Sequence, residues 1–197
     1  MADGLEKTSA HFYLTFVSYL GAMKNFNLNI RLTEAEFLKF SLQRFYQSFI
    51  GRVITIFGLI LIVIPILLFL IKPEFVNGKF PFPQFILGLV FTLGVPLLIF
   101  RASKKAYFAN NQLSEETIYT FAKEAINLQG LSYTLKLKWN RLVQVTENDA
   151  FFLLYVTKQS SHIIPKAQLS EKEESQLREL VKSIPNLTHK LFGNDQE

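Results

Sequence analysis

The chain has 197 residues, a formal net charge of +5 and no cysteine, which excludes disulfides and thiolate metal sites. Hydrophobic residues make up 49% of the chain and charged residues only 19%. A soluble domain usually carries about a quarter of charged residues, so this composition favours a membrane protein whose positive charge flanks the bilayer.

Residues 1–32 form an N-terminal strand region. Phe26 to Leu32 alternates strictly between apolar and polar side chains, which predicts a half-buried strand. Phe12 to Leu20 is rich in aromatic and β-branched residues. It is either another strand that turns at Gly21 or a segment at the membrane interface, and we prefer the strand.

An amphipathic helix is expected over residues 33–52. Thr33 precedes Glu36 by three positions, which is the spacing of a capping box that satisfies two free N–H groups at a helix start. The apolar stripe that follows has spacings of three and four: Leu38, Leu42, Phe45 and Phe49. We expect this helix to run straight on into the membrane.

Two uncharged apolar runs predict a transmembrane helical hairpin over residues 53–100. The runs cover residues 53–71, VITIFGLILIVIPILLFLI, and residues 80–100, FPFPQFILGLVFTLGVPLLIF. About 20 apolar residues in a helix cross a hydrocarbon core roughly 30 Å thick. Because only eight residues, KPEFVNGK, separate the runs, the two helices must be antiparallel and their outer ends must lie on one side.

Prolines and small residues shape the hairpin. Pro65 and Pro96 lie inside the runs and predict local kinks, because each leaves a backbone carbonyl without its usual donor. Gly88, Thr92 and Gly94 predict a close approach between helices. The preferred interpretation is packing within one chain, and the alternative is a dimer face.

Basic residues flank the outer ends of the hairpin: Lys39, Arg44, Arg52, Arg101, Lys104 and Lys105. The positive-inside rule therefore predicts that both termini are cytoplasmic. The juxtamembrane linker 101–113 and a basic strand face supply candidate membrane-surface residues: Arg101, Lys104, Lys105, Lys136 and Lys138. Near anionic headgroups each contributes about 1 kcal/mol. The alternative is that these charges only fix the topology.

Residues 114–185 change to short strands and turns and predict a small cytosolic, antiparallel β-domain closed by a helix, an α+β unit. The expected strands are Glu116–Phe121, Ala125–Leu128, Tyr133–Thr146 (bent near Asn140), Ala150–Val156 and His162–Ile164. Ser170 and Glu173 form a second capping box, and Leu177 lies on the apolar stripe of the helix they open. Pro185 ends this helix, and residues 186–197 form a tail.

The last part of this domain resembles the C-terminal domain of YcxB-like membrane proteins. The features are Lys-x-Lys-Trp ending at Trp139, a hydrophobic strand at Phe151 to Tyr155, Ile-Ile-Pro-Lys ending at Lys166, and a charged closing helix. The stretch RLTEAEFLKF and the order strand, helix, two spans and domain are also similar. The resemblance implies a bacterial origin, hence a cell (inner) membrane, and a pleckstrin-homology-like (PH-like) domain. It implies no catalytic residue; we interpret Trp139 as a core anchor and Pro165 as a strand stop.

A PH-like domain needs about seven strands, as the resemblance implies, whereas residues 114–185 supply five. An unpaired strand with one apolar face is a pairing hazard, so we expect the N-terminal strand to complete the C-terminal sheet. The hairpin is then an insertion within one split domain. The residues expected to share its core are Leu28, Ile30, Leu135, Leu137, Trp139 and Leu177.

No catalytic or metal-binding constellation is present in the sequence. The three histidines, His11, His162 and His189, lie in separate segments without metal-ligand spacing, and there is no glycine-rich phosphate loop. We therefore expect no enzyme activity, no cofactor and no nucleic-acid partner. The leading hypothesis is a membrane-anchored, non-enzymatic interaction module that binds a protein or peptide, or assembles with copies of itself. The alternative is a subunit of an oligomeric small transporter or channel, for which the polar candidates are Gln84 and Thr92.

Overall fold

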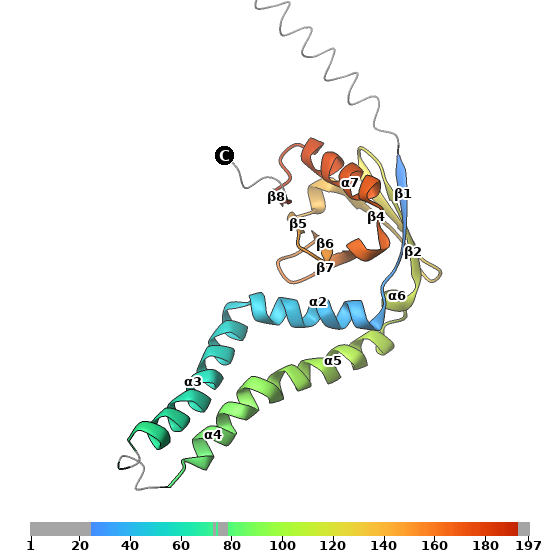
Figure 1. Ribbon diagram of the computed structural model, residues 1–197. Helices are drawn as coiled ribbons and strands as arrows, with labels where there is room; N and C mark the ends of the chain where they lie inside the picture. The colour runs from blue at the N-terminus through green and yellow to red at the C-terminus, as the bar shows by residue number, and fades with distance from the viewer. Residues whose placement is uncertain (1–24, 73, 75–78, 193–197) are drawn as a thin grey trace, which may run out of the picture. The chain divides into compact units, whose positions relative to one another are not determined.

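The computed structural model describes residues 25–72, 74 and 79–192 (Figure 1). The chain forms two compact units, a helical unit of Thr33–Ser114 and a β unit of Met1–Leu32 with Glu115–Glu197. The strand predicted at Phe12 to Leu20 lies outside the described residues. The chain is therefore α+β, with two long apolar helices and largely antiparallel sheets.

One sheet of the β unit combines a strand that precedes the helical unit in the sequence with three strands that follow it. Its four strands are antiparallel in the order β1 (Phe26–Arg31), β2 (Glu116–Phe121), β3 (Ala125–Gln129) and β4 (Thr134–Lys138). The register of β1 on β2 runs from Phe26 opposite Phe121 to Arg31 opposite Glu116. The predicted pairing of the N-terminal strand with the C-terminal sheet is confirmed.

The second sheet has the order β7 (Ser161–Pro165), β6 (Phe151–Tyr155), β5 (Gln144–Glu147) and β8 (His189–Lys190). β7, β6 and β5 are antiparallel, and β8 pairs with β5 in parallel. Sequence reasoning placed residues 186–197 in a tail, whereas β8 belongs to this sheet and Leu187 and Leu191 are buried in the core. Two-residue strands carry too little pattern to be predicted.

The chain changes sheets between β4 and β5. The prediction of one bent strand over Tyr133 to Thr146 was wrong, because a 3₁₀ turn at Trp139–Arg141 separates the two strands. Trp139 is buried at this corner, and its indole N–H donates to the carbonyl of Ala122 at 2.8 Å. The bent run was thus a sheet-to-sheet crossing stabilised by the tryptophan.

The helix α7 (Glu171–Ser183) contributes to the core of the β unit through Leu177, Leu180 and Val181. The Ser170–Glu173 capping box is present, as predicted. Of the residues expected to share the core, five are in one cluster: Leu28, Ile30, Leu137, Trp139 and Leu177. Leu135 is the exception, since 40% of it is exposed. It lies on β4, which has a neighbour on one side only among the strands that the structure describes.

The helical unit begins with α2 (Glu34–Gln47), which opens at the predicted Thr33–Glu36 capping box. The prediction that this helix runs straight on was wrong, because α2 ends before Ser48 and α3 (Phe49–Ile71) begins after it (Figure 1). The Ser48 hydroxyl accepts from the N–H of Gly51 at 2.9 Å and donates to the carbonyl of Phe45 at 2.7 Å. Ser48 thus caps both helices at the bend.

The returning segment runs from Phe82 to Ala109 as α4 (Phe82–Leu89), a π-helical turn (Val90–Gly94) and α5 (Val95–Ala109), followed by the short α6 (Asn111–Ser114). Proline has no N–H to give the carbonyl four residues earlier, which accounts for the altered turn before Pro96. Pro65, in contrast, lies buried within a continuous α3. Helices α3 and Phe82–Ala109 are long and apolar enough to cross a membrane.

Candidate functional site

Helix α3 and the returning segment approach each other closely at two glycines, Gly58 and Gly88. A Cβ on Gly88 would lie 2.9 Å from the carbonyl oxygen of Gly58, and one on Gly58 would lie 2.5 Å from the Thr92 hydroxyl. That hydroxyl donates to the carbonyl of Gly88 at 2.8 Å. Gly94 has no such neighbour, since the nearest atom belongs to Val90 of its own segment. Gly88 and Thr92 therefore pack within the chain, in agreement with the interpretation preferred from the sequence.

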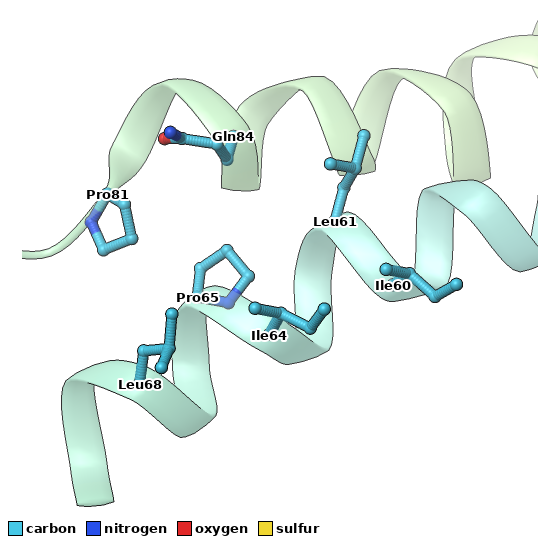
Figure 2. A pocket seen from close by; sticks show the side chains of 7 residues that line it. All are labelled: Ile60, Leu61, Ile64, Pro65, Leu68, Pro81 and Gln84. Carbon is cyan, nitrogen blue, oxygen red and sulfur yellow. The ribbon is translucent and has the colours of Figure 1, made fainter. Parts of the chain in front are cut away.

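A hollow of about 230 Å³ lies between α3 and the start of α4 (Figure 2). Its walls are almost wholly apolar and include Ile64, Pro65 and Leu68 from α3 and Pro81 from the other side. Gln84 supplies the polar group of the lining. A single amide without a charged or titratable partner is not a catalytic arrangement.

The basic residues predicted at the membrane surface fall into two groups. Arg101, Lys104 and Lys105 lie on α5, where spacings of three and four place them on one helix face. Lys104 forms an ion pair with Glu34 of α2 at 3.2 Å. Lys136 and Lys138 are exposed on one face of β4, in the other unit. The three residues of the first group lie on one helix face, and the two of the second lie on one strand face. That both groups contact lipid headgroups remains a prediction.

The residues predicted as structural core are buried. Trp139, Pro165 and Leu177 all have exposed fractions of 4% or less. Pro165 is the last residue of β7 and pairs with Phe151, so it ends the strand as the sequence indicated.

A polar cluster in the described part of the β unit surrounds Glu147, the residue after the point where the predicted strand was expected to end. Glu147 is the last residue of β5, and its side chain is fully buried. Arg178 of α7 donates to it from Nε at 3.0 Å and from Nη2 at 2.7 Å. Lys166 donates from Nζ at 2.8 Å, and the backbone N–H of Phe192 donates at 3.1 Å. The carboxylate therefore joins β5, the segment after β7, α7 and the end of the described chain.

The cations Lys166 and Arg178 each contact both carboxylates of the cluster and the ring of Phe152. Glu174 lies 2.5 Å from Arg178 and 3.3 Å from Lys166, so two carboxylates balance two cations. The ring of Phe152 lies 5.6 Å from both the Lys166 ammonium and the Arg178 guanidinium. A cation over an aromatic face gains electrostatic attraction without a further polar partner.

Burial alone raises the pKa of Glu147, but the hydrogen bonds from Arg178 and Lys166 outweigh it and leave the pKa below its ordinary value. The pKa of Arg178 is raised, chiefly by its hydrogen bonds to Glu147. A carboxylate held ionised by two cations is a poor proton donor or acceptor near neutral pH. The cluster thus has the chemistry of a structural clamp.

A signal for this cluster exists in the sequence. Val145 and Glu147 lie two positions apart on one strand, so they share the face on which Val145 is buried. Lys166 was identified only as part of a motif. The residues that the structure describes contain no group of three or more His, Asp or Glu arranged to hold a metal ion.

Comparisons with known proteins match part of the chain. Residues 121–181, which lie within the β unit, match the family model for YcxB-like protein. The chain is 25% identical over 112 residues to a Bacillus subtilis (strain 168) protein called "Uncharacterized protein YcxB". That alignment covers 56% of this chain and 60% of the relative. No solved structure matches the chain with a significant score.

Proposed function

We propose that this chain, which carries a YcxB-like domain, is a membrane-anchored, non-enzymatic interaction module. The helical unit holds the protein in the bilayer as a hairpin, and the β unit binds a protein partner at the cytoplasmic face. The observation that carries this proposal is a pair of exposed apolar helices inserted between β1 and β2 of one sheet.

The exposure of the helices supports a membrane. In their most apolar windows only 11% of α3 and 6% of Phe82–Ala109 are buried, whereas the core helix of a soluble protein is mostly buried. Their mean hydropathies there are 3.2 and 2.2. In lipid a helix satisfies its own backbone groups and needs no protein cover for apolar side chains.

The charge pattern supports cytoplasmic termini and a bacterial cell membrane crossed twice. Basic residues lie at the outer ends of both spans, which the positive-inside rule assigns to the cytoplasm. On this topology Arg101, Lys104 and Lys105 of α5 lie near the headgroups and attract anionic lipid.

The strands and the helix of the β unit support a PH-like fold. Four strands, β1 to β4, make one sheet, β5 to β7 lie in another, and α7 closes the unit. With the two-residue β8 the described strands number eight, close to the about seven that the resemblance implies, and this supports a PH-like fold. Fold alone does not imply function, so the proposed function rests on individual residues.

Binding is preferred over catalysis because the charged cluster and a hydroxyl pair of the β unit are engaged in structural contacts. Glu147 is engaged by Arg178 and Lys166, and the hydroxyl of Thr117 lies 2.9 Å from that of Tyr133. The transporter alternative is less well supported. The Thr92 hydroxyl donates to the carbonyl of Gly88 in its own segment and lies against the position of Gly58, so it already has a packing role within the chain.

Because the chain has no cysteine, single cysteines report topology without background. In intact bacterial cells we expect an impermeant maleimide to label Asn77→Cys but not Glu124→Cys, and lysis to expose the second. The protein should stay in the membrane fraction after alkaline carbonate extraction. Labelling of Glu124→Cys in intact cells would overturn the cytoplasmic placement of the β unit, and extraction of the protein would overturn the anchor. Turnover of a substrate that a point substitution abolishes would overturn the non-enzymatic assignment.

A further inference from the structure

We infer that the outer edge of β4 is a docking site for an extended acidic segment of a partner protein, which adds a fifth strand to the sheet β1–β4. This inference rests on the proposed function and names the partner by its chemistry. It concerns only the β unit.

The backbone of β4 is open on one side. Within the described part of the chain, no strand pairs with its outer edge. The N–H of Gly130 donates to the carbonyl of Tyr133 at 2.9 Å, which fixes the alternation of hydrogen bonds along the β3–β4 hairpin. This alternation turns the backbone N–H and C=O groups of Thr134, Lys136 and Lys138 away from β3.

The opposite edge of this sheet is capped at one end, at Arg31. On β1, the side-chain amide of Gln168 accepts from the N–H of Arg31 and donates to its carbonyl, both at 3.0 Å. In the second sheet, β8 pairs with β5 and covers its outer edge. Natural proteins protect or charge such edges because unpaired backbone groups recruit other strands. β4 uses charge.

The side chains of β4 specify what fits beside it. Lys136 and Lys138 are exposed on the outer face of the sheet, and Leu135, 40% exposed, lies on the inner face. A neighbouring strand with carboxylates on the outer face and an apolar residue between them would match both faces. Two copies of β4 would place four lysines on one face, so like-charge repulsion opposes self-pairing.

The test uses the full chain in detergent micelles and a fluorescein-labelled peptide, Thr-Glu-Leu-Glu-Val-Glu-Thr, followed by fluorescence anisotropy. We expect saturable binding, and binding at least tenfold weaker for the matched peptide with lysine in place of glutamate. The double variant Lys136→Gln with Lys138→Gln should weaken binding of the acidic peptide at least tenfold. Lys39→Gln, on α2 in the helical unit, is the matched charge control and should leave it unchanged.

Backbone pairing has a separate readout. Lys136→Pro removes an outward N–H that β3 does not use, so the fold tolerates it while strand addition is lost. Thermal unfolding of the variant, followed by Trp139 fluorescence, checks the fold. Independently, N-methylation of the peptide at alternate amides should abolish binding in one set and spare it in the other, because only one set faces β4.

Equal binding of the acidic peptide to wild type and Lys136→Pro, equal effects of both methylation sets, or no binding of the acidic peptide would overturn the inference. Self-association that Lys136→Pro abolishes would identify a second copy as the occupant and overturn it too. Failure of the proposed function has different signs, namely wrong topology or substrate turnover, and neither depends on β4.

Discussion

Arg178 of α7 and Glu147 of β5 form a two-pronged ion pair, with Nε 3.0 Å from one carboxylate oxygen and Nη2 2.7 Å from the other. The pair connects the closing helix to the second sheet at a point where the carboxylate is fully buried. Removing the cation leaves a buried charge that Lys166 alone must balance.

Arg178→Gln should therefore destabilise the β unit by about 3 kcal/mol, the order expected when one partner of a buried ion pair is removed. Urea unfolding in detergent, followed by the fluorescence of the single tryptophan, Trp139, measures this change. Arg141→Gln, at an exposed position, is the matched control and should change stability by less than about 0.5 kcal/mol. Similar unfolding midpoints for the two variants would refute a structural role for the pair.

The ionisation of Glu147 gives stability a pH dependence with a definite sign. Its pKa in the folded protein lies below its ordinary value of 4.5, so the unfolded chain binds more protons near that pH. The stabilisation is complete above pH 4.5 and is lost as the pH falls through the folded value. Glu147→Gln should be less stable than wild type at pH 7, and its unfolding free energy should fall less on acidification to pH 4. Parallel losses in both proteins would show that another group governs the acid response.

The helix contact at Gly88 should be sensitive to a single methyl group. In Gly88→Ala the new Cβ meets the backbone oxygen of Gly58, which cannot rotate away, so we expect a loss of about 1–3 kcal/mol. Gly94→Ala is the matched control, because its Cβ would have ordinary contacts and alanine favours a helix. Thermal unfolding of the helical unit in micelles, followed by far-ultraviolet circular dichroism, distinguishes the two variants. A melting temperature unchanged by Gly88→Ala would rule out this close crossing.

The bend between α2 and α3 should depend on Gly51. A Cβ at this position would overlap the carbonyl oxygen of Phe45, so Gly51→Ala should open the bend. Spin labels on Lys39→Cys and Val63→Cys, one on each helix, report the distance by pulsed electron resonance. We expect a longer mean distance with Gly51→Ala and no change with Gly94→Ala. The same distance in all three proteins would mean that Ser48 alone sets the bend.

Trp139 should stabilise the β unit both through the volume of its ring and through the hydrogen bond of its indole N–H. Trp139→Ala should cost about 3–5 kcal/mol, as expected for a buried aromatic residue. Trp139→Phe keeps most of the ring but leaves the carbonyl of Ala122 without its donor, and should cost about 1–3 kcal/mol. Urea unfolding followed by circular dichroism gives both values. Equal losses in the two variants would assign the whole effect to the hydrogen bond.

Local signals in the sequence predicted much of the fold. Both capping boxes are present because a hydroxyl and a carboxylate three residues apart act within one helical turn. The strands Phe26–Arg31 and Glu116–Phe121 follow from alternation, since each buries one face. Their pairing was predicted because a strand with an apolar face needs a neighbour.

Features without a periodic signal in the sequence, or dependent on distant residues, were missed. The break at Ser48 interrupts a continuous apolar stripe, and the close contact of Gly51 with Phe45 has no periodic signal. The predicted strand stopped at Thr146, one residue before Glu147, and the cations that hold Glu147 come from positions 19 and 31 residues away. Leu135 was placed in the core because alternation identifies a face but not how far the opposite layer extends.

The split of one sheet around the hairpin has a consequence for biosynthesis. The side chain of Asn29 on β1 donates a hydrogen bond to Glu116 on β2, although 87 positions separate them. At a synthesis rate of roughly 10 residues per second, β1 leaves the ribosome about 9 s before its partner. During that interval it must stay unpaired while both spans on the proposed topology enter the bilayer. A chaperone or the insertion machinery that shields the apolar face of this strand would then raise the yield of folded protein.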